Sequence, residues 1–140
     1  MLDATTIING SFCKVYHDGE WLTNVTKLEA SVKINKEEVK RAGTRWTGYK
    51  TTSLQGEGSM TGYKATHKFV KLISQITDDV SSPFVTELLL EINDPESPDS
   101  KAFIRLKGVQ FDTIPLLSYE TDKLVEEELQ FTFEGFEFVE

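Results

Sequence analysis

Leu28-Glu29-Ala30-Ser31-Val32-Lys33-Ile34-Asn35 is the stretch of sequence that decides the fold. Apolar and polar residues alternate along it, which is the pattern of a β-strand with one buried and one solvent-facing side. A charged segment follows, and residues 46–62 then return with strand-like spacing but with many Thr, Tyr, Ser, Gln and Gly residues. We therefore predict a long hairpin over residues 28–62 that is too polar to be explained by packing in a hydrophobic core.

The predicted hairpin is basic, although the chain as a whole is acidic. Residues 27–50 contain seven Lys or Arg residues and three acidic residues, which gives this segment a net charge of +4. The 140-residue chain has a net charge of −8, so the remaining residues carry −12 by subtraction. This excess of acids argues against a general nucleic-acid-binding protein, which needs Lys and Arg to displace the counterions of phosphates.

One face of the hairpin is almost wholly polar. Odd positions of the returning strand carry hydroxyl, amide or carboxylate groups, and they match the polar positions of the first strand of the hairpin. The candidate polar face consists of Glu29, Ser31, Lys33, Asn35, Thr51, Ser53, Gln55, Glu57 and Ser59. The even positions include Gly56, Gly58 and Gly62, which lack the dinucleotide-binding spacing. We expect these glycines to permit bending of the strand or close approach of another backbone.

The remaining sequence predicts a single domain over residues 1–140, mainly β with one flanking α-helix, arranged as a β-sandwich or small barrel of about seven strands. Asp18-Gly19 predicts a tight first hairpin, because it supplies the positive φ angles of such turns. Residues 84–92 and 102–111 alternate as strands, and Gly108 predicts a bulge. The last strand places Leu129, Phe131 and Phe133 on one face before Gly135 shifts the pattern to Phe136 and Phe138, and we expect it to pack against the helix or the opposite sheet.

The helix is expected over residues 66–77, with Thr66 as its N-cap. Its apolar stripe, which would cover one face of a sheet, consists of Phe69, Leu72, Ile73 and Ile76.

Chemistry-bearing motifs are absent from the sequence. Cys13 is the only cysteine, which excludes an intrachain disulfide and a cysteine-based zinc site, and we expect it to be a small buried residue. Two histidines do not suggest a metal site, and the acidic residues 93–100 lack the EF-hand glycine and terminal glutamate. No catalytic constellation is recognisable, so we predict no enzyme activity, cofactor or metal. No apolar span of 18 residues occurs, so we expect a cytoplasmic product without membrane binding.

Four segments, in order, resemble a known family. They are Leu28-Glu29-Ala30-Ser31-Val32 continuing through Asn35-Lys36 and Glu38-Val39-Lys40, then Gly43-x-Arg45-x-Thr47-Gly48-x-Lys50-Thr51-Thr52, then Tyr63-Lys64-x-Thr66-x-Lys68-Phe69-Val70, and finally Glu126-Glu127-Glu128-x-x-Phe131-Thr132-Phe133-Glu134-x-Phe136. The chain resembles the tail tube proteins of contractile-tailed phages over most of its length, and among them those of PBSX-type defective prophages.

The resemblance implies a structural subunit that forms hexameric rings stacked head to tail into a hollow tube inside a contractile sheath. Its implied partners are other copies of the chain, the sheath protein, and the baseplate, tape-measure and tail-terminator proteins, with DNA only in transient, non-specific passage. It also implies assembly in the bacterial cytoplasm and a final location in the virion tail or a tail-like particle.

We expect two surfaces of the hairpin to have separate roles in such a tube. The polar face is the candidate lumen wall, since its acidic balance would repel phosphate. The inter-ring docking hairpin consists of Lys36, Glu37, Glu38, Val39, Lys40, Arg41, Gly43, Arg45 and Trp46. We expect its cations to meet carboxylates of the next ring.

Two other functions remain open at this point. A type VI secretion tube protein shares the expected fold but belongs to a different machine. A monomeric β-barrel ligand-binding protein would need an apolar cavity. The sequence does not distinguish an infectious phage, a defective prophage and a bacteriocin.

Overall fold

Strands dominate the structure, a computed structural model that describes residues 2–64, 67–75, 84–97 and 101–139, without the side chains of Lys68 and Phe69. Two short 3-10 turns, Ala4–Thr6 and Gly10–Phe12, open the chain. The strands are β1 (Cys13–His17), β2 (Glu20–Trp21), β3 (Val25–Val39), β4 (Gly48–Tyr63), β5 (Val85–Ile92), β6 (Ala102–Phe111), β7 (Glu126–Phe133) and β8 (Gly135–Val139), and the helix is α1 (Lys68–Ile73). The prediction of a mainly β protein with one helix is confirmed.

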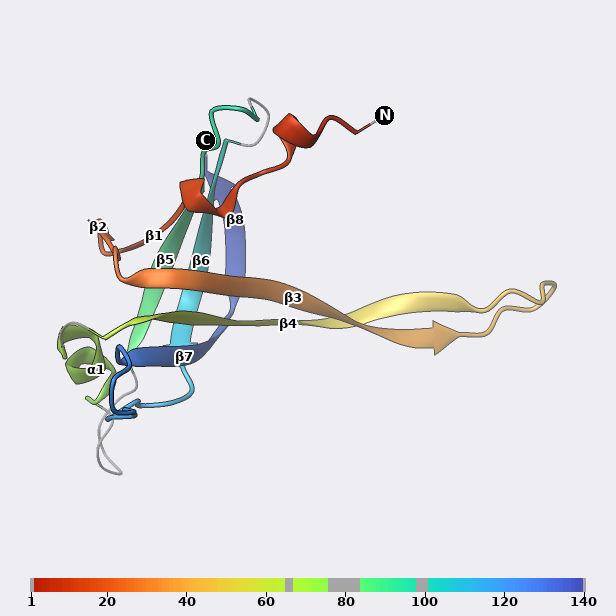
Figure 1. Ribbon diagram of the computed structural model, residues 1–140. Coiled ribbons are helices and arrows are strands. Elements are labelled where there is room, and N and C mark those ends of the chain that lie inside the picture. Colours follow the sequence, from red (N-terminus) through yellow and green to blue (C-terminus); the bar gives the residue numbers. More distant parts are fainter. Residues whose placement is uncertain (1, 65–66, 76–83, 98–100, 140) are drawn as a thin grey trace.

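The strands form one antiparallel sheet in the order β2-β1-β5-β6-β7-β4-β3, with β8 also paired to β6. Two strands share one edge of β6: β8 pairs with its first half and β7 with Gln110 and Phe111. The chain turns between β7 and β8, so that β3, β4 and β7 run across β5, β6 and β8 as a second layer (Figure 1). This crossing of layers agrees with the predicted sandwich. The turn also explains why the last predicted strand is two strands, giving eight in the described residues.

The core lies between these layers. Its buried residues come from β1, β4, α1, β5, β6 and β7, and they are Val15, Met60, Ile73, Leu88, Leu106, Val109, Leu129, Phe131 and Phe133. The alternating Leu129, Phe131 and Phe133 are buried as predicted. The turn at Asp18-Gly19 and the bulge at Gly108 are also confirmed, because all three residues have positive φ angles and the β5–β6 register shifts beside Gly108.

The β3–β4 hairpin extends far beyond the rest of the sheet. Strand pairing runs from Val25↔Gly62 to Val39↔Gly48, which leaves residues 40–47 as the tip. Strand β7 pairs only with Gly56–Tyr63 of β4. Residues 33–55, here called the arm, therefore project as a two-stranded ribbon that ends in the tip (Figure 1). Strand pairing continues through Val39, so the first strand of the hairpin extends into the charged segment that follows Asn35.

Glycines in β4 allow β7 to lie close against it. A Cβ atom on Gly56 would lie 2.5 Å from the ring of Phe133, and one on Gly58 would lie 2.7 Å from Cζ of Phe131. These glycines stand directly opposite the two phenylalanines in the strand register. The prediction that glycine permits close approach is confirmed, and the aromatic rings occupy the space that the glycines leave.

Three sequence-based expectations were wrong. The described helix is only Lys68–Ile73, with His67 as its N-cap and no side-chain cap bond. Within the predicted apolar stripe, Ile73 is buried and Leu72 is 38% exposed. Ile76 and the predicted N-cap Thr66 lie outside the described residues. Cys13 is exposed at the start of β1.

Phe136 and Phe138 are likewise exposed rather than packed. They stand opposite Leu106 and Ile104, their partners in β6, but unlike Leu106 they do not belong to the core. Among the described residues, no helix is long and apolar enough to cross a membrane.

Candidate assembly surfaces

The strand register brings most of the candidate polar face together. Glu29, Ser31, Lys33 and Asn35 of β3 stand opposite Ser59, Glu57, Gln55 and Ser53 of β4. Asn35 Nδ2 donates a hydrogen bond to Ser53 Oγ over 3.0 Å, so these two side chains share one face. The face continues onto β7, where Gln130 and Thr132 stand opposite Ser59 and Glu57. The polar face is therefore a three-stranded surface that runs out along the arm.

Thr51 does not belong to this face. The register shifts by one residue between Asn35↔Ser53 and Lys36↔Thr51, which leaves Thr52 unpaired in a bulge. Because side chains alternate along a strand, the extra residue moves Thr51 to the opposite side of the ribbon, with Lys36. Thr52 Oγ1 donates to the carbonyl of Asn35 and holds the bulge in place. The sequence alternation carried no sign of it.

The polar face is weakly acidic near the body of the protein. A shallow groove of about 320 Å³ is lined by Glu29, Ser31, Glu57 and Ser59 together with Asp112 and Gln130. Lys27 Nζ lies 3.3 Å from Glu29 Oε1, but both side chains are mostly exposed. Exposed ion pairs of this kind contribute little stability, so the face behaves mainly as a wet, acidic surface.

The other face of the arm also carries Lys36 and Thr51, but we call it the apolar face because two large apolar side chains lie uncovered on it. Ile34 and Leu54 stand directly opposite each other in the ribbon and are 54% and 64% exposed. Trp46 at the tip is 81% exposed, and Tyr49 is 65% exposed. A two-stranded ribbon is marginally stable by itself in water, so this face is suited to contact with another molecule.

The cations of the docking hairpin form no ion pair with the residues that the structure describes. Across the described ranges, none of Lys36, Lys40, Arg41 and Arg45 forms an ion pair. Bases in the body are used differently: Arg105 Nη1 lies 2.7 Å from Glu137 Oε1, and Lys107 Nζ lies 3.1 Å from Glu137 Oε2. The docking hairpin thus presents unpaired positive charge at the end of a projecting ribbon.

Sequence reasoning missed an apolar and acidic surface at the opposite end of the molecule. The segment between β6 and β7 exposes Leu116, Leu117, Tyr119 and Leu124. Two grooves lie along it, of about 380 and 520 Å³, and both include Ser118 and Glu126 in their lining. We call residues 115–128 with Tyr63 the loop surface. Its sequence signal was the nine acids against the single Lys123 in residues 112–140, but without alternation the exposed leucines could not be assigned a face.

A buried contact fixes the loop surface to the sheet. Lys64 Nζ donates to the carbonyl of Leu116 over 2.9 Å and lies 3.7 Å from Glu127 Oε2. Both charged side chains are about nine-tenths buried, at 8% and 11% exposure. Removing one partner of such a pair would leave an uncompensated charge, so the contact holds the segment in a defined position.

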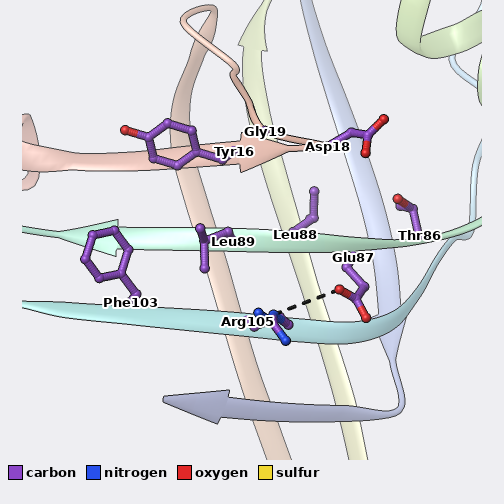
Figure 2. A pocket seen from close by; sticks show the side chains of 9 residues that line it. All are labelled: Tyr16, Asp18, Gly19, Thr86, Glu87, Leu88, Leu89, Phe103 and Arg105. Atoms are coloured by element: carbon purple, nitrogen blue, oxygen red, sulfur yellow. Dashed lines mark ion pairs between the residues drawn. The ribbon is translucent and has the colours of Figure 1, made fainter. Parts of the chain in front are cut away.

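The groove on the outer side of β1, β5 and β6 has mixed character. Figure 2 shows Tyr16, Leu89, Phe103 and Arg105 projecting from neighbouring strands into a groove of about 630 Å³. Tyr16 donates a hydrogen bond to Glu91 Oε2 over 2.7 Å, and this bond raises the pKa of the Tyr16 hydroxyl above its ordinary value. The groove opens at the surface, unlike the enclosed apolar cavity that a ligand carrier needs. In the described part of the chain, no group of three or more His, Cys, Asp or Glu residues is placed to hold a metal ion.

Comparison with known proteins points to one family. The family model described as "Phage tail tube protein" matches residues 1–140. The Phage-like element PBSX protein XkdM of Bacillus subtilis (strain 168) is 37% identical over 140 residues, which cover 99% of this chain and 95% of XkdM.

Solved structures share the fold at much lower sequence identity. The tube-terminating cap of the anti-feeding prophage superposes with a TM-score of 0.76 at 7% identity, covering 99% of this chain and 95% of that one. The sheath-tube complex of the PVC extracellular contractile injection system contains a chain that superposes with a TM-score of 0.72, also at 7% identity, covering 95% and 91%. At this identity the likeness concerns the fold alone.

Proposed function

Since the chain belongs to the phage tail tube protein family, we propose that its copies close into hexameric rings and that these rings stack head to tail into a hollow tube. The observation that carries the proposal is the match to this family over the whole chain. The family is one of phage tail structural proteins, and it separates this chain from type VI secretion tube proteins and from monomeric ligand carriers.

The geometry of the arm supports stacking. A head-to-tail interface is heterologous, so each subunit needs two different complementary surfaces. The arm carries an uncovered apolar face and unpaired cations, which are features of a surface that another copy covers. The tip therefore docks on the next ring, with its charges setting register and encounter rate more than raw affinity.

The polar face lines the channel in this proposal. It runs over three strands and out along the arm, which is the part of the chain that reaches the next ring in this proposal. Hydroxyl and amide groups hold a layer of water, and the carboxylates of Glu29 and Glu57 repel phosphate. DNA passes such a wall without binding to it.

The family match and the solved structures of similar fold support the remaining partners. The PVC chain of similar fold is part of a sheath-tube complex. We propose that a contractile sheath surrounds this tube, that baseplate, tape-measure and tail-terminator proteins meet its ends, and that assembly in the cytoplasm precedes incorporation into a virion tail or tail-like particle.

A pair of adjacent thiols tests the channel wall. Ser53 and Leu54 are consecutive residues of β4, so their side chains lie on opposite faces of the ribbon. In a Cys13→Ser background, Ser53→Cys or Leu54→Cys places one thiol on one of these faces, and maleimide-linked gold marks it in assembled tubes. We expect density for the gold inside the channel with Ser53→Cys and not with Leu54→Cys. Gold outside the channel for Ser53→Cys, or a thiol that remains unreactive in the core of the subunit, would refute the assignment.

A further inference from the structure

We propose that the loop surface, residues 115–128 with Tyr63, is the receptor for the tip of the arm of a second copy of this chain. The inference rests on the proposed function and names the two surfaces that meet between rings.

The two surfaces lie at opposite ends of one strand. Tyr63 ends β4 and lines a groove of the loop surface, whereas Gly48 begins β4 beside the tip. The 16 residues of β4 span about 50 Å at roughly 3.3 Å per residue. In Figure 1 the segment after β6 likewise lies at the end of the molecule away from the tip. A tip therefore cannot reach the loop surface of its own chain, but translation of a second copy along the strand direction brings the two together.

The charges of the two surfaces are complementary. Lys40, Arg41 and Arg45 are unpaired within the described residues. Glu126 and Glu128 on the loop surface are exposed and likewise form no ion pair in the described part of the chain, since the nearby ion pairs are Lys64–Glu127 and Lys123–Glu120. The tip thus has a net positive charge and the loop surface a net negative charge.

Both surfaces also expose large apolar side chains. Trp46 is 81% exposed at the tip, and Tyr119 and Leu124 are 73% and 77% exposed along the groove that Tyr63 lines. Aromatic residues and Arg dominate the energetics of protein interfaces, particularly when a ring enters a pocket flanked by other rings. Trp46 is therefore the anchor, with Tyr63 and Tyr119 as its contacts.

The arm is long enough for this contact. Residues 48–55 of β4 extend beyond the pairing with β7 and span about 26 Å, before the eight residues of the tip are counted. The loop surface, by contrast, is held rigidly by the buried Lys64 contacts with Leu116 and Glu127. Each subunit thus has two different surfaces, a projecting tip and a receptor for it, as a heterologous interface requires.

Photo-crosslinking in assembled tubes tests the proposal. Trp46 is replaced by p-benzoylphenylalanine in unlabelled chains, which are assembled with ¹⁵N-labelled wild-type chains, irradiated, digested and analysed by mass spectrometry. We expect cross-links between the probe and labelled peptides from residues 115–128 or Tyr63, and loss of these cross-links with labelled chains that carry Glu126→Arg and Glu128→Arg. The reciprocal probe at Tyr119 should react with residues 40–47, whereas a control probe at the exposed Phe136 should not.

The outcomes separate the two proposals. Tubes whose Trp46 and Tyr119 probes react with other parts of the chain would overturn the receptor assignment and leave the tube intact as a function. If wild-type protein forms no tubes, the proposed function itself falls, and the receptor with it. If only the Trp46 probe prevents assembly, the Tyr119 probe decides the question.

Discussion

The apolar face of the arm allows a quantitative prediction. Ile34 and Leu54 stand opposite each other and keep 54% and 64% of their surface exposed in the isolated subunit. Complete burial of such a side chain stabilises by roughly 1.5–3 kcal/mol, so assembly has about half of that still to gain at each position. Changing both residues to Thr retains strand propensity but removes most of this gain, about 1–2.5 kcal/mol for the pair.

The expected result is a change in assembly without a change in subunit stability. At 1.4 kcal/mol per factor of ten, the double variant Ile34→Thr/Leu54→Thr should raise the critical concentration for tube formation roughly 5- to 60-fold. Its unfolding free energy should stay within about 0.5 kcal/mol of wild type, because both side chains are at the surface of the monomer. Sedimentation of tubes over a concentration series and chemical denaturation of the monomer measure the two quantities.

A matched control lies on the neighbouring rung of the same ribbon. Lys33 and Gln55 also stand opposite each other, but on the polar face. Lys33→Thr/Gln55→Thr should leave the critical concentration nearly unchanged. Equal effects of the two pairs, or an unchanged critical concentration for the apolar pair, would refute the idea that this face is covered in the assembly.

Three further predictions concern the subunit itself. Gly58→Ala should lower the unfolding free energy by about 1–3 kcal/mol in denaturant titrations, because its Cβ would collide with the Glu29 carbonyl and lie 2.7 Å from Cζ of Phe131; wild-type stability would contradict the packing. Phe131→Ala should cost about 3–5 kcal/mol by the same assay, since Phe131 is 0% exposed, and a loss below 1 kcal/mol would argue against its central place in the core. The raised pKa of Tyr16 means that its hydrogen bond stabilises the fold below the ordinary tyrosine pKa, about 10, and that this contribution is lost as pH rises through the folded value. Ultraviolet titration should therefore show one late-titrating tyrosine that moves back toward the ordinary range in Glu91→Ala, and an unchanged curve would exclude the bond.

The local sequence pattern was sufficient to predict a structural feature where only neighbouring residues of the same segment determine that feature. Alternation from Leu28 to Gly62 predicted the hairpin, and Asp18-Gly19 predicted a turn, because strand period and positive φ are properties of a few neighbouring residues. The glycines of β4 were assigned close approach correctly, although the sequence did not identify Phe131 and Phe133 as the approaching groups.

Burial that depends on the second layer was not predictable in this way. Phe138 alternates like Phe131, but only Phe131 faces the core between the two layers, so one is 69% exposed and the other 0%. The position of Thr51 on the other face of the ribbon was not predictable either, because the bulge at Thr52 depends on the register between two strands. The leucines of the loop surface were missed because a segment without strand or helix periodicity has no predictable inner side.

Electron cryo-microscopy of the purified, assembled protein tests the central claim most directly. The account predicts hollow tubes of stacked sixfold rings, with Glu29, Ser31, Gln55 and Glu57 facing the channel and the tip of each arm in contact with the adjacent ring. Monodisperse monomers at high concentration, or tubes in which the polar face lies on the outside, would contradict it.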